Sequence, residues 1–330
     1  MRALFLAALL SVALFAPARA ETDTLNLGVQ RGMTYLPWIV MQHEHMVEQQ
    51  AAAAGMPGLK VTYNVFSGGP AMTDGLLSGA IDVASTGMPS FLALWAKGKG
   101  KFAVIGLSSY GSMPAVLVTR NPNVHTLADF TDKDRIATPG VKTSTQAIFL
   151  QIAAEKLYGF ADLHHFDAIT VTRGHPDAVA AVLGGTEVNS HFSILPYIRT
   201  ELAAPGVHAV TNSEEIMGGA VSNGTTFLTA RFATENPKVI AALYAALKQA
   251  VALIAADPAR AAADYLAVSG EKTTQAEMVA QITDPGTRFD VAPHGIMVMA
   301  NFLHRTGVVA AAPKDWKELY LPLVHGEPGG

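Results

Sequence analysis

The segment Leu76–Pro89 reads LLSGAIDVASTGMP and is the most informative stretch of the chain. Its pattern predicts the end of a helix, a glycine turn, a short buried strand from Ala80 to Ser85, and a Gly-Met-Pro corner where that strand stops. A corner of this kind lies at the carboxyl edge of a sheet, where ligands bind in open α/β folds. The segment therefore predicts a sheet with a ligand site at its edge.

Short β-rich runs alternate with helical patterns on both sides of this segment, which is typical of βαβ units and predicts an α/β fold with a largely parallel sheet. From Pro237 onward the pattern changes to helices. A helix is also expected near the N-terminus, over Pro37–Ala54. The expected strands are Thr24–Val29, Lys60–Phe66, Ala80–Ser85, Phe102–Ser109, Ala115–Thr119, Arg135–Thr138, Ile169–Thr172, Glu187–Ser190, Val207–Thr211 and Thr225–Thr229.

Residues 1–20 are typical of a secretory signal peptide. Arg2 supplies a positive charge, an apolar run extends from Ala3 to Phe15, and a small-residue exit ends at Ala20. We therefore expect cleavage after Ala20 and a periplasmic protein. No later run approaches the length of a spanning helix, so the mature chain is expected not to be embedded in a membrane.

The composition excludes several classes of function. The chain contains no cysteine, so disulfides, thiolate metal sites and cysteine nucleophiles are excluded, as is a lipid-anchoring cysteine. With a formal charge of −4 and only 15% charged residues, nothing indicates a nucleic-acid surface. The histidines show no recognisable metal-ligand spacing, so no metal and no other cofactor is assigned. The expected partner is a small molecule, and the protein is expected to be a monomer.

The mature chain is longer than the ~250–300 residues at which single cores usually stop growing, so two lobes are expected. Lobe I is predicted to comprise residues 21–109 and 222–330, and lobe II residues 110–221. The first crossing is placed at Tyr110–Pro114, and the return crossing runs through Gly218–Gly224. Two crossings form a hinge, and hinge closure around a small ligand is a common motion of such proteins.

Preceded by Phe66-Ser67-Gly68-Gly69-Pro70, the segment Leu76–Pro89 resembles the periplasmic solute-binding proteins of the nitrate, sulfonate and taurine group of ABC transporters, and similar thiamine-precursor binders. The resemblance covers essentially all of the mature chain and implies the α/β two-lobed type II periplasmic-binding-protein fold, with mixed sheets flanked by helices. It also implies a receptor whose closed form docks on a membrane permease driven by an ATPase. The chain has no nucleotide motif, so energy coupling would belong to those ABC permease and ATPase subunits.

Candidate ligand-binding loops of the first lobe follow its strands. Gly68 and Gly69 allow close backbone approach, and the N–H groups of the helix that follows favour an anion. Ser67 either caps that helix or donates to the ligand. Arg31 suits a carboxylate or sulfonate, and Trp38 could cover a planar ligand; alternatively Arg31 is solvated and Trp38 lies in the core.

The second lobe offers a glycine loop and a hydroxyl cluster at the entry of a long helix, over residues 138–145. Its N–H groups, its hydroxyls and the ammonium of Lys142 suit an anion. Alternatively Thr143 or Ser144 only caps the helix and Lys142 points to water. The family resemblance places a Gly-Ser-Ser-like loop against the ligand here.

His191 and Phe192 follow the expected strand Glu187–Ser190, and His191 could donate to an anion, stack on a ring or be structural. Relatives often carry a tryptophan and an acid ahead of a Pro-Tyr pair. Here Pro196 and Tyr197 are present without that tryptophan and acid, which argues against sulfonate or taurine specificity. The complete set of expected ligand-binding residues is Gln30, Arg31, Tyr35, Trp38, Ser67, Gly68, Gly69, Gly87, Met88, Pro89, Tyr110, Lys142, Thr143, Ser144, Thr145, His191, Phe192 and Asn223.

The sequence favours a transport receptor for a small organic anion of the sulfonate, taurine or nitrate type over an enzyme. The alternative ligand is a planar nitrogen heterocycle such as a thiamine-precursor pyrimidine. An enzyme on the same scaffold is disfavoured for two reasons. Related pyrimidine synthases carry a cysteine-rich motif, which this chain cannot supply because it has no cysteine, and this chain has no nucleophile-elbow pattern. A binding domain that presents its closed form to a sensor is a further alternative.

Overall fold

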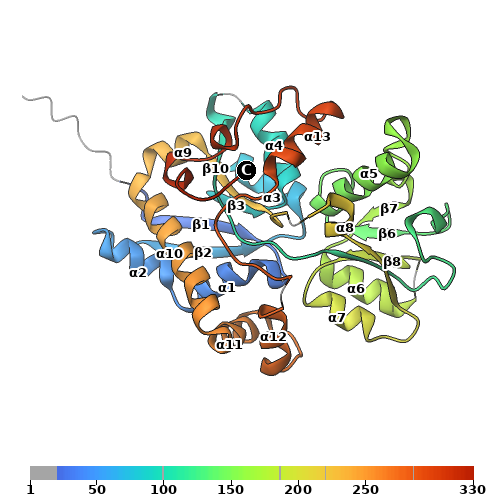
Figure 1. Cartoon of the computed structure of the whole chain (residues 1–330). Coiled ribbons are helices and arrows are strands. Elements are labelled where there is room, and N and C mark those ends of the chain that lie inside the picture. Colours follow the sequence, from blue (N-terminus) through green and yellow to red (C-terminus); the bar gives the residue numbers. More distant parts are fainter. Residues whose placement is uncertain (1–20, 99, 186, 220, 285) are drawn as a thin grey trace, which may run out of the picture.

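The computed structural model describes residues 21–98, 100–185, 187–219, 221–284 and 286–330, so the expected signal peptide lies outside the described residues. The strands form two five-stranded sheets, each flanked by helices (Figure 1). Both sheets combine parallel and antiparallel pairs, so the largely parallel sheet expected from the alternation of strands and helices is wrong, whereas the mixed sheets implied by the resemblance are confirmed. This architecture confirms the expected two-lobed α/β fold. We call each sheet with its covering helices a lobe; the residue limits predicted for the lobes stay a prediction.

The first sheet has the strand order β2-β1-β3-β10-β4. Parallel pairing joins β1 to β2 and to β3, whereas β10 is antiparallel to β3 and β4. All four residues of β3 are buried, as expected for a central strand covered on both faces. The strands are β1 (Thr24–Val29), β2 (Lys60–Val65), β3 (Val83–Thr86), β4 (Val104–Ser109) and β10 (Thr225–Thr229).

Nine helices of the described residues belong to the first lobe. The single helix expected over Pro37–Ala54 is wrong, because His45 adopts a left-handed conformation, with φ of 51°, and divides it into two. The helices are α1 (Leu36–His43), α2 (Met46–Ala53), α3 (Gly69–Ser78), α4 (Met88–Lys97), α9 (Ala230–Glu235), α10 (Pro237–Ala256), α11 (Pro258–Ser269), α12 (Gln275–Ile282) and α13 (Ile296–Arg305).

By length and composition alone, α10 could cross a membrane, contrary to the expectation that no run after the leader has that length. Its apolar face packs on α1 and α2, and half of its most apolar window is buried inside the molecule. These are the contacts of a core helix, and among the described residues no second helix meets the same criteria.

The second sheet has the order β7-β6-β8-β5-β9. The strand expected at Glu187–Ser190 is shifted: β8 begins at Ser190 and includes His191 and Phe192, with all four of its residues buried. Its strands are β5 (Val116–Thr119), β6 (Ile136–Thr138), β7 (Thr170–Thr172), β8 (Ser190–Ser193) and β9 (His208–Asn212), and its helices are α5 (Thr145–Tyr158), α6 (His175–Gly184), α7 (Tyr197–Leu202) and α8 (Ser213–Met217).

The chain passes between the sheets after β4 and again before β10, and side-chain hydrogen bonds join the two crossings. Asn223 accepts from the backbone N–H of Met113 at 2.7 Å and donates to its carbonyl at 2.9 Å. A later segment runs alongside, because Ser112 and Arg288 exchange backbone hydrogen bonds of 2.8 Å in both directions. The hinge therefore consists of three connected segments.

Candidate functional site

A cavity of about 40 Å³ lies between the two lobes. The lobes touch around it: the N–H of Met33 donates to the carbonyl of Leu195 at 2.8 Å. None of the described residues that line it is Asp, Glu, Lys or Arg, so its wall is neutral and rich in hydrogen-bonding groups. The lining residues are Gln30, Thr34, Tyr35, Gly69, Thr86, Gly87, Tyr110, Ala115, Pro139, Ser144, Thr145, Gln146, Phe149, His175, Ile194 and Asn223.

Four helices begin at the wall of this cavity. From the first lobe, α3 begins at Gly69 and α4 follows its N-cap Gly87; from the second, α5 follows its N-cap Ser144 and α6 begins at His175. The first N–H groups of a helix have no partner within it, and the helix dipole makes this end positive. The cavity is therefore electropositive without containing a formal cation.

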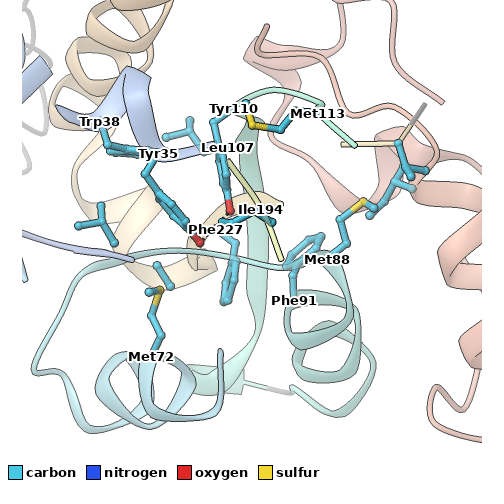
Figure 2. Packing of buried hydrophobic residues seen from close by; sticks show 14 of the residues in the cluster. Tyr35, Trp38, Met72, Met88, Phe91, Leu107, Tyr110, Met113, Ile194 and Phe227 are labelled. Atoms are coloured by element: carbon cyan, nitrogen blue, oxygen red, sulfur yellow. Dashed lines mark hydrogen bonds between the residues drawn. The ribbon is translucent and has the colours of Figure 1, made fainter. Parts of the chain in front are cut away.

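Two tyrosines form the aromatic part of the first-lobe wall. The Tyr110 hydroxyl donates to that of Tyr35 at 3.2 Å, and Figure 2 shows the two hydroxyls pointing toward each other. Burial raises the pKa of both side chains, so both stay protonated. The Tyr35 hydroxyl thus keeps a proton to donate. Beside them, the amide of Gln30 donates to Thr86 Oγ1 at 2.9 Å, which fixes both groups at the end of β3.

The second-lobe wall contains two adjacent hydroxyls with different roles. Ser144 caps α5, because its Oγ accepts from the N–H of Ala147 at 3.2 Å. Thr145 is 4% exposed, and among the described residues its Oγ1 finds no hydrogen-bond partner. A buried hydroxyl without a partner costs about 1–3 kcal/mol. Thr145 is therefore the side chain best suited to receive a polar ligand.

A chain of three buried side chains ends at the cavity. His175 Nδ1 lies 2.9 Å from His191 Nε2, and His191 Nδ1 lies 2.8 Å from Glu201 Oε1. His191 and Glu201 have no exposed surface, whereas His175 lines the cavity. Burial lowers the pKa of His175 well below its ordinary value, and His191 lowers it further. His175 is therefore neutral.

The structure brings together eight of the residues expected from the sequence, and a groove continues from them to the surface. Arg31 and Ser67 line this groove, of about 380 Å³, which shares Gln30 and His175 with the cavity. Arg31 is exposed at this mouth. The eight expected residues that line the cavity are Gln30, Tyr35, Gly69, Gly87, Tyr110, Ser144, Thr145 and Asn223.

Other expected residues lie behind the cavity wall. Trp38, Met88 and Phe192 are core residues, and the Trp38 ring packs edge-on against Tyr110, 6.5 Å between centroids (Figure 2). His191 lies behind His175 instead of beyond a strand end, because β8 starts three residues later than expected.

The remaining expected residues lie at the edge between the lobes. Gly68 packs so closely on the Pro139 carbonyl that a Cβ there would overlap it. Pro89, Lys142 and Thr143 line a separate apolar groove of about 230 Å³. The Lys142 ammonium, 61% exposed, lies 3.7 Å from Asp167 instead of facing the cavity.

Sequence reasoning missed half of the lining residues. His175 follows β7 and is the first residue of a helix. The loops that follow strands were the candidates for the site, so His175 would have been included if the helix had been predicted to start there. Gln146 and Phe149 lie within the first turns of α5, where no pattern separates cavity from core. Thr34, Thr86 and Pro139 lie in loops expected at the site, over residues 30–37, 86–89 and 138–145, but were not singled out within them, and Ala115 and Ile194 were missed altogether.

Away from the cavity, His43, Glu44 and Asp264 place ligand-type atoms within 4.8 Å of one another. His43 Nδ1 lies 2.9 Å from Asp264 Oδ1. The guanidinium of Arg260 bonds both carboxylate oxygens of Glu44 and so balances the local negative charge. This cluster is an ion-pair network that ties α11 to α1.

Comparisons with known proteins identify the fold. No family model matches the chain, and no curated protein matches its sequence. The alkanesulfonate-binding protein SsuA from Xanthomonas axonopodis pv. citri, solved with MOPS, has a TM-score of 0.67 at 20% identity, covering 89% of this chain and 96% of its own.

Two further structures agree. The periplasmic aliphatic sulphonate binding protein SsuA of Escherichia coli has a TM-score of 0.64 at 20% identity, covering 93% of this chain and 100% of its own. The periplasmic nitrate-binding protein NrtA of Synechocystis PCC 6803 has a TM-score of 0.61 at 17% identity, covering 82% and 74%. The chain therefore has the two-lobed fold of periplasmic solute-binding proteins, and its structural neighbours include the sulfonate and nitrate binders that its sequence resembles.

Proposed function

We propose that this protein is the periplasmic substrate-binding component of an ABC importer and captures a small oxyanion between its two lobes. The observation that carries the proposal is the convergence of four helix N-termini on one interlobe cavity. Anions bind readily at helix N-termini, because the N–H groups and the dipole act together. Because the cavity wall carries no formal positive charge, it can bind the anion through N–H groups and hydroxyls without holding it too tightly for release.

The size of the cavity supports an anion of few atoms. Its volume of about 40 Å³ is some three times the ~10–15 Å³ that one water requires. Nitrate and methanesulfonate are of this order. Arg31, at the mouth of the adjoining groove, would attract an anion before the lobes close.

The aromatic rings of the cavity wall support a second candidate ligand, a planar nitrogen heterocycle. Tyr35, Tyr110, Phe149 and His175 all line the cavity, and such rings can stack on a flat ligand. A heterocycle needs the cavity to be larger than it is in this closed arrangement. We therefore keep it as the second candidate.

A thermal-shift panel on the mature protein distinguishes the candidates. Nitrate, methanesulfonate, ethanesulfonate, acetate and an aminopyrimidine would be tested at equal ionic strength. A ligand at 100 times its Kd adds about 2.7 kcal/mol of stability. Stabilisation by nitrate or sulfonates alone supports the proposal, stabilisation by the pyrimidine alone supports the second candidate, and no shift with any member contradicts both.

Thr145→Val tests whether the cavity is the site. Because the unpartnered hydroxyl costs the fold stability, its loss leaves the unliganded fold at least as stable as before, whereas affinity for the anion found in the panel falls by about 1–2 kcal/mol, roughly tenfold. Calorimetric titration measures the affinity, and urea unfolding measures the stability.

Lys142→Ala is the matched control, because Lys142 carries a charge near the cleft but does not line the cavity. Its Kd is expected to equal that of the wild type. A large loss in this variant with none in Thr145→Val would place the ligand in the outer groove.

A further inference from the structure

We propose that His175 is the residue that sets which ligands the cavity accepts, and that an anionic acceptor binds there together with one proton taken up by the chain Glu201–His191–His175. This inference rests on the proposed function and adds a hydrogen-bond rule to it. The observations that carry it are the two short contacts along this chain and the burial of all three side chains.

Each contact in the chain needs one hydrogen, and this links the three groups. Between His175 Nδ1 and His191 Nε2, 2.9 Å apart, one nitrogen must donate and the other must accept. If Glu201 is ionised and both rings are neutral, His191 donates from Nδ1 to the carboxylate. His191 Nε2 then has only a lone pair, so His175 must donate from Nδ1. The second ring nitrogen of His175, Nε2, is left as an acceptor.

One added proton reverses the hydrogen-bonding role of His175 Nε2. If the proton sits on His191, its ring donates both to Glu201 and to His175 Nδ1, so His175 carries its hydrogen on Nε2. If the proton sits on Glu201, the carboxyl donates to His191 Nδ1, and each ring again carries its hydrogen on Nε2. Either placement turns His175 Nε2 from an acceptor into a donor. The proton count of the chain therefore decides what the cavity offers.

The surroundings leave this nitrogen to the ligand. Across the part of the chain that the structure describes, no protein group is hydrogen-bonded to His175 Nε2, although the residue lines both the cavity and its mouth. A nitrate or sulfonate oxygen needs a donor there, so binding recruits a proton. A ligand N–H meets the acceptor without one.

The titratable groups around the chain are few. Tyr197 of α7 stacks on His175 with 6.0 Å between centroids, and burial together with the neighbouring Glu271 raises its pKa, so it stays neutral. From β5 and β6, the residues paired with His191 are Val118 and Ala137, which do not titrate. Arg31 and Asp177 lie in the groove beside His175, and their opposite charges flank it at the mouth.

Calorimetric titration of the mature protein with nitrate and with methanesulfonate tests the proton uptake. Repeating the titration at pH 8 in buffers of different ionisation enthalpy gives the number of protons bound with the anion, which is expected to be one. The apparent Kd is then expected to rise about tenfold per pH unit above the pKa of the free chain. Binding without proton uptake and with a constant Kd from pH 5.5 to 9 would overturn the inference.

Glu201→Gln tests the role of the proton while keeping the hydrogen bond to His191. Its amide can donate to His191 without ionisation, so the donor form of His175 exists at every pH. We expect binding to continue, with proton uptake close to zero and a flat pH profile. Glu187→Gln is the control, because that carboxylate is 79% exposed in the same lobe, and it should keep the wild-type profile.

The ring tautomers can be measured without any ligand. Long-range ¹⁵N–¹H correlation spectra of the unliganded protein at pH 8–9 should show both His175 and His191 with hydrogen on Nδ1 and a bare Nε2. An Nε2–H tautomer of His175 at this pH would refute the inference even if every anion binds. If none of the probes binds, the proposed function fails, and the tautomers still decide the state of the chain.

Discussion

Asp134 shows how a single buried carboxylate secures the second lobe. It has no exposed surface, and its oxygens accept from Asn121 Nδ2 at 2.7 Å, Asn189 Nδ2 at 2.8 Å and the N–H of Thr131 at 2.8 Å. Burial alone would raise its pKa, but the backbone N–H of Thr131 and the side-chain donors outweigh it and hold the pKa below the ordinary value. The ionised form is therefore the one that the fold stabilises.

We predict that Asp134→Asn lowers the free energy of unfolding by about 1–3 kcal/mol at pH 7. Because the folded-state pKa lies below the ordinary 3.8, the carboxylate contributes stability above that value, and the contribution is lost as the pH falls through the folded-state pKa. Urea unfolding at pH 7 and pH 3 measures the difference between variant and wild type. The exposed neighbour in Asp132→Asn is the control; an equal loss at both pH values would contradict the argument.

For single residues, the sequence predicted which segments lie near the cavity better than which side chains face it. His191 was expected at a strand end facing the ligand, but it lies within β8 and reaches the cavity only through His175. Every residue of β8 is buried, so the alternation that normally marks a strand's limits is absent. A slip of the boundary changes which side chain faces the cavity.

Among the elements, the starts of α3 and α4 are the parts of the first lobe that press on the second. A Cβ at Gly68 would overlap the Pro139 carbonyl, and one at Gly87 would overlap Thr145 Oγ1. Gly68 has an extended backbone that any residue adopts, so its importance is steric. The glycines permit the helix N-termini to approach the ligand when the lobes close.

Gly68→Ala is therefore expected to hold the lobes apart without damaging either one. Overpacking of this kind costs about 1–3 kcal/mol, and the cost falls on the closed, liganded state. Affinity should fall by that amount while the unliganded protein unfolds as before. Calorimetry and urea unfolding measure the two effects. Gly58→Ala is the control, because a Cβ there meets nothing within 4 Å; equal affinities of the two variants would show that the contact does not limit closure.

The order of elements could be predicted from the sequence, because strand Thr24–Val29 and strand Thr225–Thr229 have strong β patterns and clear limits. The break between α1 and α2 could not, since His45 adopts a positive φ without a glycine to mark it. Which helix starts converge on one cavity also depends on how the lobes meet, and no local pattern records that.

At the scale of the whole molecule, two ion pairs of the described residues join the lobes: Arg305 with Glu155, and Arg199 with Asp284 at 3.8 Å. Arg305, at the end of α13, forms two hydrogen bonds with the Glu155 carboxylate of α5, of 2.7 and 3.0 Å. The guanidinium also lies 5.8 Å from the ring centroid of Phe160, in the second lobe. Because α13 and α5 belong to different lobes, both contacts join the lobes, and any motion that separates these two helices would break them.

We predict that Arg305→Ala favours opening by about 0.2–1 kcal/mol, the usual range for exposed ion pairs. Ligand release should become faster by up to about fivefold, with little change in the rate of binding. The wild type should approach the variant near 1 M salt, where the Debye length falls to about 3 Å. Stopped-flow measurement of ligand release at low and high salt tests this prediction.

Lys248→Ala is the control. It removes an ion pair of 2.9 Å with Glu327 within the first lobe and should leave the rate of ligand release unchanged. A release rate in Arg305→Ala that equals the wild type at low salt would show that this ion pair does not hold the lobes closed.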